Sequence, residues 1–470
     1  MFLNIKNRQS LPFFLLISSV FLFLVAPQLL SDGMFMDGLL YAVISNNLSN
    51  GYGTFWNLFL SETLYPSFHE HPPLAFGLQS LFFNLFGESR FIERTYSICC
   101  FIISGFIIAK IWQKTNPKKF HKLAWLPLLF LVITPLISWS ASNNMLENTM
   151  MIFTSLSILF FIRAINENRS IYFILMGFVL FLGFLTKGFV ALFPLSILVW
   201  YTLFHPPFSY RKLFLSSFLS LLGLILPFFF LFFLLPESYI SLGAYFEKQV
   251  VGSITSIQTV DTRFWILWKL FQELIPGIIL LSLFFVFSKT SLNHDYQSNW
   301  FLIFIAVGLS GVIPIMISLK QSGFYILAAF PFFSIAFSIL IRNPVNVFVN
   351  KITSKEVVYR RFLYSCIILL GLSFLLNFFF ANTIQRDRLM LNDVYKIINV
   401  VPKNSTIAIT NQLYNNWSLH GYFRRYGCIS LDRNLSLNHN YRLIYGKLSS
   451  LDGYQKLDLE LDSFSLFKKL

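Results

Sequence analysis

Residues 171–204 read IYFILMGFVLFLGFLTKGFVALFPLSILVWYTLF, and this stretch decides the class of fold. It consists of two apolar runs, 171–186 and 188–204, which are separated by Lys187. A helix needs roughly 17–25 mostly apolar residues to cross the hydrocarbon core of a bilayer. Each run is close to that length, so we predict two transmembrane helices, with Lys187 between them at one membrane surface.

The composition of the whole chain agrees with this prediction. Hydrophobic residues make up 56% of the 470 positions, charged residues make up 12%, and the mean hydropathy is +0.64. Soluble domains are about 45–50% apolar and about 25% charged. A chain of this length cannot hide so much apolar surface from water. We therefore exclude a soluble protein and expect lipid to surround most of the chain.

The other apolar segments of suitable length extend along most of the sequence. They are 11–30, 91–112, 123–140, 145–164, 213–235, 264–287, 301–319, 324–341 and 362–381. Together with the two runs above, they predict an all-α polytopic membrane bundle of about eleven transmembrane helices. The run 11–30 shows no small-residue cleavage site, so we expect it to remain as the first transmembrane helix.

The net charge of +15 is explained by the loops between these segments, without a nucleic-acid partner. Cytoplasmic loops of membrane proteins are enriched in Lys and Arg. Lys6 and Arg8 therefore place the N-terminus in the cytoplasm, and the basic clusters of the later loops fall on the same side if the apolar run 72–87 does not cross. These clusters contain Lys114, Lys118, Lys119, Lys122, Arg163, Arg169, Arg211, Lys212, Lys289, Arg342, Lys351, Lys355, Arg360 and Arg361. We predict that 72–87 is a helix lying at the outer surface.

The segment 382–470 is more polar and is expected on the outer side. A helix-like stretch at Asp387–Val400 and strand-like stretches at Thr406–Thr410 and Tyr441–Tyr445 predict a small extracytoplasmic α/β domain. The chain is thus divided into a membrane domain, 1–381, which includes a long outer loop at 31–90, and a C-terminal domain, 382–470.

Acidic residues on the predicted outer side are candidates for chemistry, because charges near a membrane are costly to keep. Asp37 follows the first span, and Tyr41 lies four residues later on the same helical face. Glu70 precedes His71 and a Pro-Pro pair, and Glu147 lies near the outer end of a span. Each acid also has a structural explanation, because carboxylates are favourable at the beginning of a helix. A carboxylate flanked by imidazoles could instead bind a metal, so a divalent metal at Glu70 is a further hypothesis.

Basic residues on the same side are also informative. Lys187, Lys320, Arg94 and Arg263 all lie near the outer ends of predicted spans, and Tyr325 follows Lys320. They are explained either by an anionic ligand or by side chains that extend to the lipid headgroups. A carboxylate can accept a proton from a nucleophile, and cations can stabilise a phosphate leaving group. The combination suits transfer from a lipid phosphate.

The order of these motifs resembles the GT-C superfamily of membrane glycosyltransferases, in particular the protein O-mannosyltransferases and the lipid A aminoarabinose transferases. The resemblance covers about residues 11–340. It is carried by Asp37…Tyr41-Ala42, Glu70-His71-Pro72-Pro73-Leu74, Leu81-Phe82…Leu85-Phe86-Gly87-Glu88 with Arg94, Met145-Leu146-Glu147, Leu185-Thr186-Lys187-Gly188 and Lys320…Tyr325…Pro331.

This resemblance implies an inverting transfer of a sugar from a polyprenyl-phosphate carrier to a lipid, glycan or protein acceptor, at the outer face of a bacterial inner membrane. It implies that Asp37 is the catalytic base and that Glu147, at the second acidic position of the family, is also a catalytic residue. It implies phosphate binding by His71, Lys187, Arg263 and Lys320. Substrate positioning is implied for Tyr41, Glu70, Arg94 and Tyr325, and Glu70 is also the position of a metal site in the aminoarabinose branch.

Two positions depart from the family pattern. Gly38 follows Asp37 where an Asp-Glu pair is common, and His71 replaces the Lys that often precedes Pro-Pro. Two other classes of function remain open from the sequence. A transporter or flippase would also carry charges within its bundle, but we find no inverted repeat. A polymerase or ligase of lipid-linked oligosaccharides would be expected to concentrate its functional residues in one large, late outer loop, whereas here the early loop 31–90 carries the candidate residues.

Overall fold

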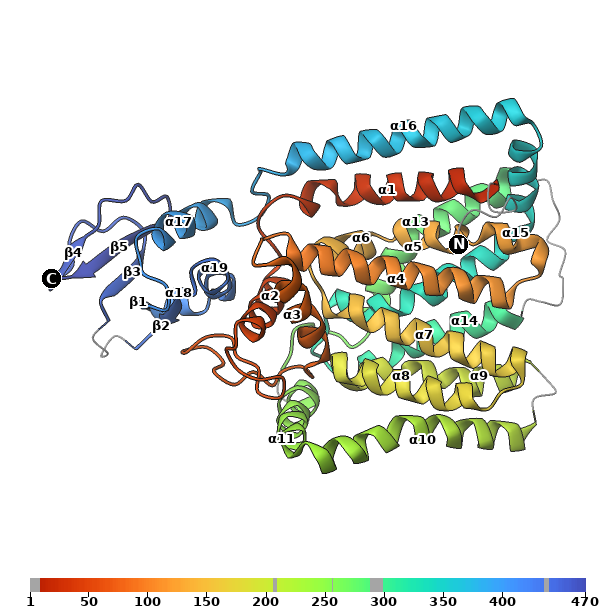
Figure 1. The fold of residues 1–470 in the computed structure, drawn as a ribbon, viewed down its shortest axis with the longest axis horizontal. Coiled ribbons are helices and arrows are strands. Elements are labelled where there is room, and N and C mark those ends of the chain that lie inside the picture. The colour runs from red at the N-terminus through yellow and green to blue at the C-terminus, as the bar shows by residue number, and fades with distance from the viewer. Residues whose placement is uncertain (1–8, 206–208, 256, 288–298, 435–438) are drawn as a thin grey trace.

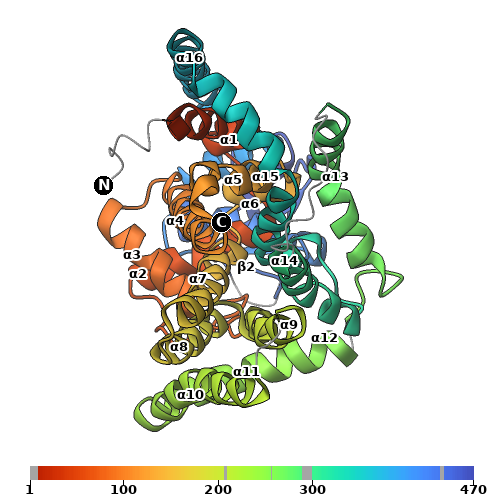
Figure 2. The same cartoon turned by 90° about the vertical axis from the view of Figure 1, so that its right-hand side faces the viewer.

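The computed structural model describes residues 9–205, 209–255, 257–287, 299–434 and 439–470. Its long helices lie side by side, and a small sheet projects beyond one end of the bundle (Figure 1). One edge is formed by α1 (Leu11–Leu29) and α16 (Glu356–Phe380), and the opposite edge by α10 (Tyr210–Leu234), as the end-on view also shows (Figure 2). Lys6, Arg8 and Lys289, which support the topology prediction, lie outside the described residues.

The remaining long elements fill the bundle between these two edges. They are α4 (Ile92–Thr115), η2 (Lys118–Leu123), α5 (Leu126–Val132), α6 (Pro135–Ser142), α7 (Leu146–Glu167), α8 (Ile171–Lys187), η3 (Gly188–Ser196), α9 (Ile197–Phe204), α13 (Trp265–Phe287), α14 (Asn299–Ser310), η6 (Ile313–Ile317), η7 (Gly323–Ala329) and α15 (Phe330–Thr353). In the described part of the chain, nine helical segments are long and apolar enough to cross a membrane, or ten with one bent pair. The predicted polytopic α-helical bundle is confirmed.

The segment Ile171–Phe204 is one continuous apolar stretch, but the contacts show that it runs out and back. Lys187 pairs with Glu147 at the beginning of α7. Tyr172 instead stacks on Phe160, and Tyr201 meets Phe161 edge to face, near the other end of α7. α8 and the η3–α9 segment are therefore antiparallel, as the sequence predicts, and the reversal occurs at Gly188, whose φ is +78°. A left-handed φ of this kind is accessible to glycine at little cost.

The predicted span 123–140 is not a straight helix. α5 and α6 meet at an angle of 81°. Pro135 begins α6, and Thr134 before it has an extended ψ of 116°. A proline disfavours the helical conformation in the preceding residue and removes a backbone donor, so one straight helix cannot pass this point.

The basic loops that the topology prediction assigns to one side do meet at one end of the bundle. Lys114, at the end of α4, forms an ion pair with Glu167 at the end of α7, 3.3 Å apart. Arg342 donates to Asn116 over 2.8 Å, and Lys122 donates to Asn350. This is the end away from the sheet (Figure 1). The candidate acids Asp37 and Glu147 begin helices at the opposite end.

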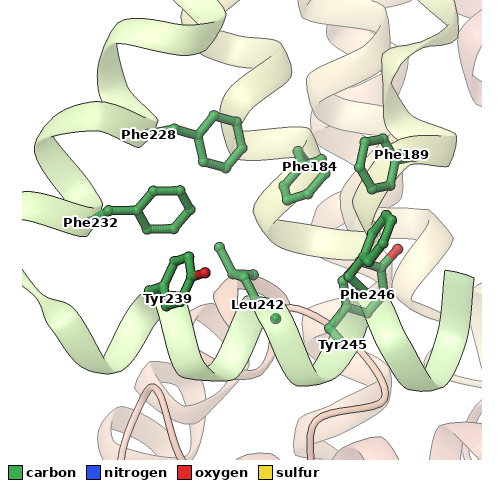
Figure 3. A pocket seen from close by; sticks show the side chains of 9 residues that line it. Phe184, Phe189, Phe228, Phe232, Tyr239, Leu242, Tyr245 and Phe246 are labelled. Carbon is green, nitrogen blue, oxygen red and sulfur yellow. The ribbon is translucent and has the colours of Figure 1, made fainter. Parts of the chain in front are cut away.

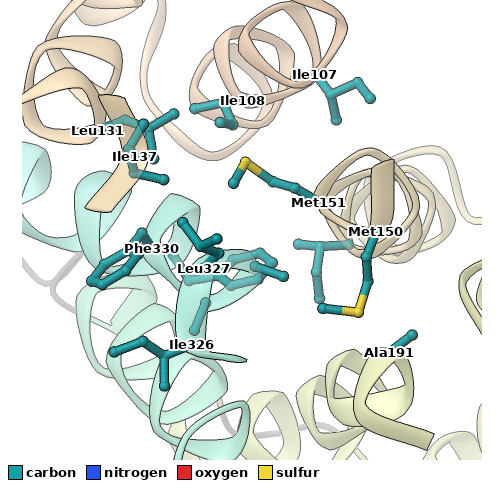
Figure 4. Packing of buried hydrophobic residues seen from close by; sticks show 14 of the residues in the cluster. Ile107, Ile108, Leu131, Ile137, Met150, Met151, Ala191, Ile326, Leu327 and Phe330 are labelled. Carbon is teal, nitrogen blue, oxygen red and sulfur yellow. The ribbon is translucent and has the colours of Figure 1, made fainter. Parts of the chain in front are cut away.

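The apolar core lies where α4, α5, α6, α7, η7 and α15 meet. Ile108, Leu131, Ile137 and Phe330 are fully buried there, and Met150 and Met151 fill the space between them (Figure 4). Methionine is flexible and polarisable, so it fits the irregular gap between helices that cross at different angles. This packing fixes the beginning of α7, and therefore Glu147, relative to the rest of the bundle.

Two shorter helices lie between the bundle and the sheet. α2 (Met36–Ser49) carries Asp37 in its first turn, and α3 (Leu74–Phe86) packs on α2. With 13 residues, α3 is too short to cross a bilayer, which needs roughly 17–25. The prediction that 72–87 does not cross is therefore confirmed. α11 (Pro236–Tyr245) and α12 (Gly252–Thr255), joined by the π-helical turn η4 (Phe246–Val251), also lie at this end.

The C-terminal segment forms a five-stranded sheet with the order β2-β1-β3-β5-β4. Its elements are α17 (Arg388–Ile398), β1 (Thr406–Ile409), α18 (Asn411–Tyr414), α19 (Trp417–Gly427), β2 (Ser430–Asp432), β3 (Tyr441–Tyr445), β4 (Tyr454–Lys456) and β5 (Phe464–Lys469). β1 pairs in parallel with β2 and β3, and β5 pairs antiparallel with β3 and β4. The predicted helix near 387–400 and the two predicted strands are present as α17, β1 and β3.

Helix α19 joins this sheet to the membrane part through buried polar contacts. Arg425 forms an ion pair with Glu93 of α4 at 3.1 Å, and each side chain is only 2% exposed. Arg425 also donates to the backbone carbonyls of Glu88 and Ser89. Gly421 lies against Leu39 of α2, where an added Cβ would come within 2.7 Å of a leucine methyl group. The C-terminal segment is therefore packed directly on the helix that carries Asp37.

The Arg425–Glu93 pair gives a first prediction, about stability. Removing one member of a buried pair leaves the other charge unpaired, which typically costs about 3–5 kcal/mol. We expect Arg425→Met to lower the free energy of unfolding in detergent by an amount of this order. The double variant Arg425→Met with Glu93→Leu should recover a large part of the loss. As a control, Arg360→Met removes an exposed pair with Glu356 and should change stability by less than about 1 kcal/mol. Equal losses in the two single variants would contradict the prediction.

Candidate functional site

The candidate acids and bases converge at the end of the bundle that faces the sheet. Asp37 is close enough to Glu70, Glu147, Lys187 and Lys320 for all four charges to influence its ionisation. Tyr41 and His71 adjoin the same group, and Tyr325 lies against Lys187. Eight of the ten residues predicted from the sequence therefore share one site, although they come from five separate segments.

Asp37 is the centre of this group. Its position in the first turn of α2 follows from the extended backbone of Phe35, after which the helix begins. Burial is the main cause that raises the pKa of Asp37, from 3.8 to about 6. Lys187 and Lys320 lower this pKa, while Glu147 and Glu70 raise it. A carboxylate with a pKa near 6 is mostly ionised at neutral pH and is a stronger base than an ordinary aspartate.

Tyr41 and His71 form a neutral pair beside Asp37. The Tyr41 hydroxyl lies 3.1 Å from Nε2 of His71. Burial holds the pKa of His71 well below its usual value, and Lys187 and Lys320 lower it further. The imidazole is therefore uncharged at neutral pH. A phosphate contact by His71, as predicted, would have to be a hydrogen bond rather than an ion pair.

Glu147 and Lys187 form a buried ion pair at the base of the site. Glu147 is fully buried at the beginning of α7, and Lys187 is 7% exposed at the end of α8. The Lys187 ammonium also lies over the rings of Phe324 and Tyr325, at 5.3 and 5.1 Å from their centres. Cation–π contacts of this kind are stronger when the cation is desolvated. The pair holds the Lys187 ammonium, together with its partner carboxylate, next to Asp37.

Lys320 and Arg263 are two of the predicted outer cations of the late loops, and of these two only Lys320 is among the charges that act on Asp37. Lys320 is half-buried, interacts with Asp37 and His71, and donates to Gln249 over 2.9 Å. Arg263 is exposed, and its described hydrogen bond uses its backbone carbonyl, which accepts from Gln321. Arg263 is thus not among the residues that surround Asp37, and its phosphate-binding role stays a prediction.

Arg94 is buried below the site rather than in it. Its guanidinium donates to the backbone carbonyls of Gly33 (2.6 Å) and Ser142 (3.1 Å). These bonds join the segment before α2 to the end of α6. The contacts favour a role in holding Asp37 in place over a direct contact with substrate.

The family pattern has a Glu after the catalytic Asp, and this chain has Gly38. The structure gives a steric explanation for the glycine that the sequence does not reveal. Gly38 packs against the backbone of Asn143, and an added Cβ would lie 1.8 Å from the carbonyl oxygen. Asn144 adds a hydrogen bond from its side chain to the Gly38 carbonyl at 3.0 Å, and it also accepts from Gln79 at 2.7 Å. These two polar residues support α2, yet their sequence context carries no motif that identifies them.

The structure does not support a metal site at Glu70. The three side chains of His69-Glu70-His71 contact different partners: Ser241, Tyr65 and Tyr41, respectively. Among the described residues, no group of three or more His, Cys, Asp or Glu side chains could hold a metal ion. The residues present do not fit a metal, and the mechanism below uses none.

An apolar cavity adjoins the site. It has a volume of about 240 Å³ and lies between α8, η3, α10 and α11 (Figure 3). Phe184, Phe189, Phe228 and Phe232 face Tyr239, Leu242, Tyr245 and Phe246 across it. The Tyr245 hydroxyl lies 3.5 Å from the Lys187 carbonyl, so the cavity begins next to the residue that carries the buried positive charge. Aromatic side chains of this kind suit an unsaturated hydrocarbon.

Comparison with known proteins identifies the fold that carries these residues. Residues 70–235 match the family described as dolichyl-phosphate-mannose-protein mannosyltransferase. The fold is similar to the crystal structure of ArnT from Cupriavidus metallidurans bound to undecaprenyl phosphate, with a TM-score of 0.68, 14% identity and 97% of each chain covered. This is the GT-C fold. The archaeal oligosaccharyltransferase AglB from Archaeoglobus fulgidus, in complex with an inhibitory peptide and a dolichol-phosphate, shares this GT-C fold at a TM-score of 0.51, with 12% identity over 94% of this chain and 70% of that chain. No curated protein sequence matches the chain.

The close approach at Gly38 gives the second prediction. Gly38→Ala should displace α2 from Asn143, because the Asn143 carbonyl cannot move away without disturbing the backbone hydrogen bond from the Asn143 amide to Ser140. We expect a loss of about 1–3 kcal/mol in unfolding free energy, as for other overpacked sites. The matched control is Gly371→Ala in α16, where an added Cβ meets nothing within 4 Å; it should be neutral or slightly stabilising. Similar thermal unfolding of the two variants would contradict the packing described here.

Proposed function

We propose that the chain is an inverting glycosyltransferase that moves a sugar from a polyprenyl-phosphate carrier to a lipid, glycan or protein acceptor. The observation that carries the proposal is the arrangement of Asp37, a carboxylate with raised pKa, beside the Lys187 and Lys320 ammonium groups. We further propose that this end of the bundle faces outward from a bacterial inner membrane, with the N-terminus in the cytoplasm and the C-terminal domain outside.

The carrier phosphate would bind at the basic side of the site. Lys320 and Lys187 supply positive charge there, and His71 supplies a neutral hydrogen-bonding group. Glu147 would hold the Lys187 ammonium in place, since both groups are nearly inaccessible to solvent. The apolar cavity next to Lys187 has the chemistry required for the first isoprene units of the carrier. The structure of ArnT contains undecaprenyl phosphate and that of AglB contains a dolichol-phosphate, which supports this assignment.

The transfer itself would occur in one displacement. Asp37 accepts the proton of the acceptor hydroxyl or amine as that atom attacks the anomeric carbon. The new glycosidic bond forms while the bond between the anomeric carbon and the phosphate oxygen breaks. The electron pair of the broken bond stays on the polyprenyl phosphate, where the lysine charges stabilise it. Glu70 and Tyr325, which flank Asp37, would position the acceptor and the sugar.

The third prediction tests the base. Asp37→Asn should lower glycosyl transfer by about 10²–10⁴-fold, because asparagine cannot accept a proton. The wild-type rate should fall as the pH drops below about 6, where Asp37 becomes protonated. The residual rate of the variant should not show this fall at acidic pH. The assay is transfer by purified protein from radiolabelled polyprenyl-phosphate sugars to a membrane extract.

The control for this assay is Glu62→Gln, which removes an exposed acid from the same outer loop and should leave the rate unchanged. Near wild-type turnover by Asp37→Asn would refute the assignment of the base. Folded wild-type protein that transfers no sugar but takes up substrate into sealed vesicles would favour a transporter instead.

The fourth prediction concerns the carrier tail. Leu242→Trp would fill much of the apolar cavity that Leu242 lines. We expect the KM for a long-chain polyprenyl donor to rise by roughly tenfold or more, the scale of a 1–3 kcal/mol packing penalty. A donor with a short, water-soluble tail should be affected much less. Leu375→Trp, at a lipid-facing position of α16, is the control. Equal KM changes for both donors would show that the cavity does not receive the tail.

A further inference from the structure

We propose that Tyr65 is a positioning residue for Glu70, and that the C-terminal domain holds Tyr65 in place through Trp417. The inference rests on the proposed function, and it makes the C-terminal domain part of the apparatus that sets the geometry of the site. Neither Tyr65 nor Trp417 belongs to a motif that the sequence reveals.

The backbone of Tyr65 is held in an unfavourable conformation. Its φ is +52°, in the left-handed region. The other described non-glycine residues with positive φ are four Asn or Asp residues and Cys428. An aromatic residue has no local side-chain hydrogen bond to offset the clash of its Cβ in this region. Such a conformation persists only where surrounding contacts impose it, and such residues often lie at functional sites.

The side chain of Tyr65 contacts Glu70 and two aromatic rings, and these contacts hold its backbone in the left-handed conformation. The Tyr65 hydroxyl donates to Oε1 of Glu70 over 2.5 Å. Burial and this hydrogen bond raise the pKa of Tyr65, so the phenol remains a proton donor at any physiological pH. The Tyr65 ring packs against Phe68 on one side, with centres 5.7 Å apart, and against Trp417 at 5.6 Å. One oxygen of the Glu70 carboxylate is thereby fixed by a ring that two other rings hold in place.

The C-terminal domain forms three hydrogen bonds with the loop that contains Tyr65. The Thr63 hydroxyl donates to the Leu431 carbonyl of β2 over 2.7 Å, and the Glu62 amide donates to the Ser430 hydroxyl over 3.3 Å. The Tyr414 hydroxyl donates to the Thr63 carbonyl over 3.2 Å. Together with the Trp417 contact, these bonds join β2, α18 and α19 to loop residues 62–65, only five residues before Glu70.

Helix α19 also supports the segment that leads to Asp37. The Met34 amide donates to the Tyr422 hydroxyl over 3.2 Å, and Gly421 packs closely on Leu39 and Leu40 of α2. Trp417 and Tyr422 lie on the same 11-residue helix. One helix of the C-terminal domain therefore contacts the supports of both carboxylates, Asp37 and Glu70, and fixes their separation.

The experiment is a double-mutant cycle on transfer kinetics. Tyr65→Phe removes the hydroxyl and keeps the ring that packs on Trp417. A hydrogen bond to a charged group corresponds to roughly a tenfold to hundredfold effect. We expect kcat to fall by that factor, with the KM for the polyprenyl donor changed less than threefold. In a Glu70→Ala background, which removes the acceptor, the Tyr65→Phe change should have less than a threefold effect, because a residue that acts only through Glu70 loses its influence with it.

Two further substitutions separate positioning from general stability. Tyr414→Phe removes a hydroxyl that holds the same loop but does not touch Glu70, so its kcat should stay within threefold of wild type. Trp417→Ala should lower kcat as Tyr65→Phe does, and Trp417→Phe should restore most of the rate by keeping an aromatic partner. Thermal unfolding of each variant shows whether the fold is retained.

The outcomes distinguish this inference from the proposed function. Sugar transfer by wild type, with Tyr65→Phe unchanged, would overturn the inference alone. Equal losses in Tyr65→Phe with and without Glu70 would also overturn it, since Tyr65 would then act independently of Glu70. Equal losses in Tyr414→Phe and Tyr65→Phe would reduce the effect to loop stability and refute positioning. A wild-type protein that transfers no sugar from any donor would instead refute the proposed function itself.

Discussion

The buried ion pair between Glu147 and Lys187 constrains the rest of the site. It joins the beginning of α7 to the point where α8 ends and the chain reverses into η3. Burying either charge alone would cost several kcal/mol of folding free energy, so each needs the other as its partner. The pair therefore fixes three elements at once, because the Lys187 ammonium also lies over Phe324 and Tyr325 of η7. Asp37 is then placed against this fixed charge by the packing of Gly38 on Asn143.

A second constraint comes from the polar contacts between the bundle and the sheet. Asp32 is 1% exposed and accepts from Arg90 and Tyr426, at 3.1 Å each, and from Tyr395. Arg425 and Glu93 pair a short distance away along α19 and α4. Buried polar groups need specific partners, unlike apolar surface, which is satisfied by many neighbours. These contacts therefore give the C-terminal domain a defined position over α2 and the outer loop, where a purely apolar interface would allow several.

The electrostatic arrangement is suited to chemistry on a lipid phosphate. The Lys187 and Lys320 ammonium groups act on Asp37, and the backbone carbonyl of Lys187 lies 3.5 Å from the hydroxyl of Tyr245, which lines the aromatic cavity. His71 is neutral in this setting because burial and the two lysines oppose its protonation. A lysine in its place would have added a third ammonium group to a small volume. The neutral imidazole instead forms a hydrogen-bonded pair with Tyr41, and the positive charge remains on Lys187 and Lys320.

The sequence alone determined the membrane class, the out-and-back pair at Lys187 and the non-crossing helix 72–87. It also identified Asp37 and seven of the residues around it, because hydropathy and isolated charges are local properties of the chain. Its limits appear where distant segments meet. The predicted span 123–140 bends by 81° at Pro135, Arg94 donates to backbone carbonyls, and Arg263 is not among the charges that act on Asp37. Gln79, Asn144, Tyr65 and Trp417 gave no signal, since each acquires its role from contacts that the sequence pattern does not show. Only the tertiary structure could decide these points, because close approach and hydrogen-bond partners depend on packing between segments and not on the pattern within any one of them.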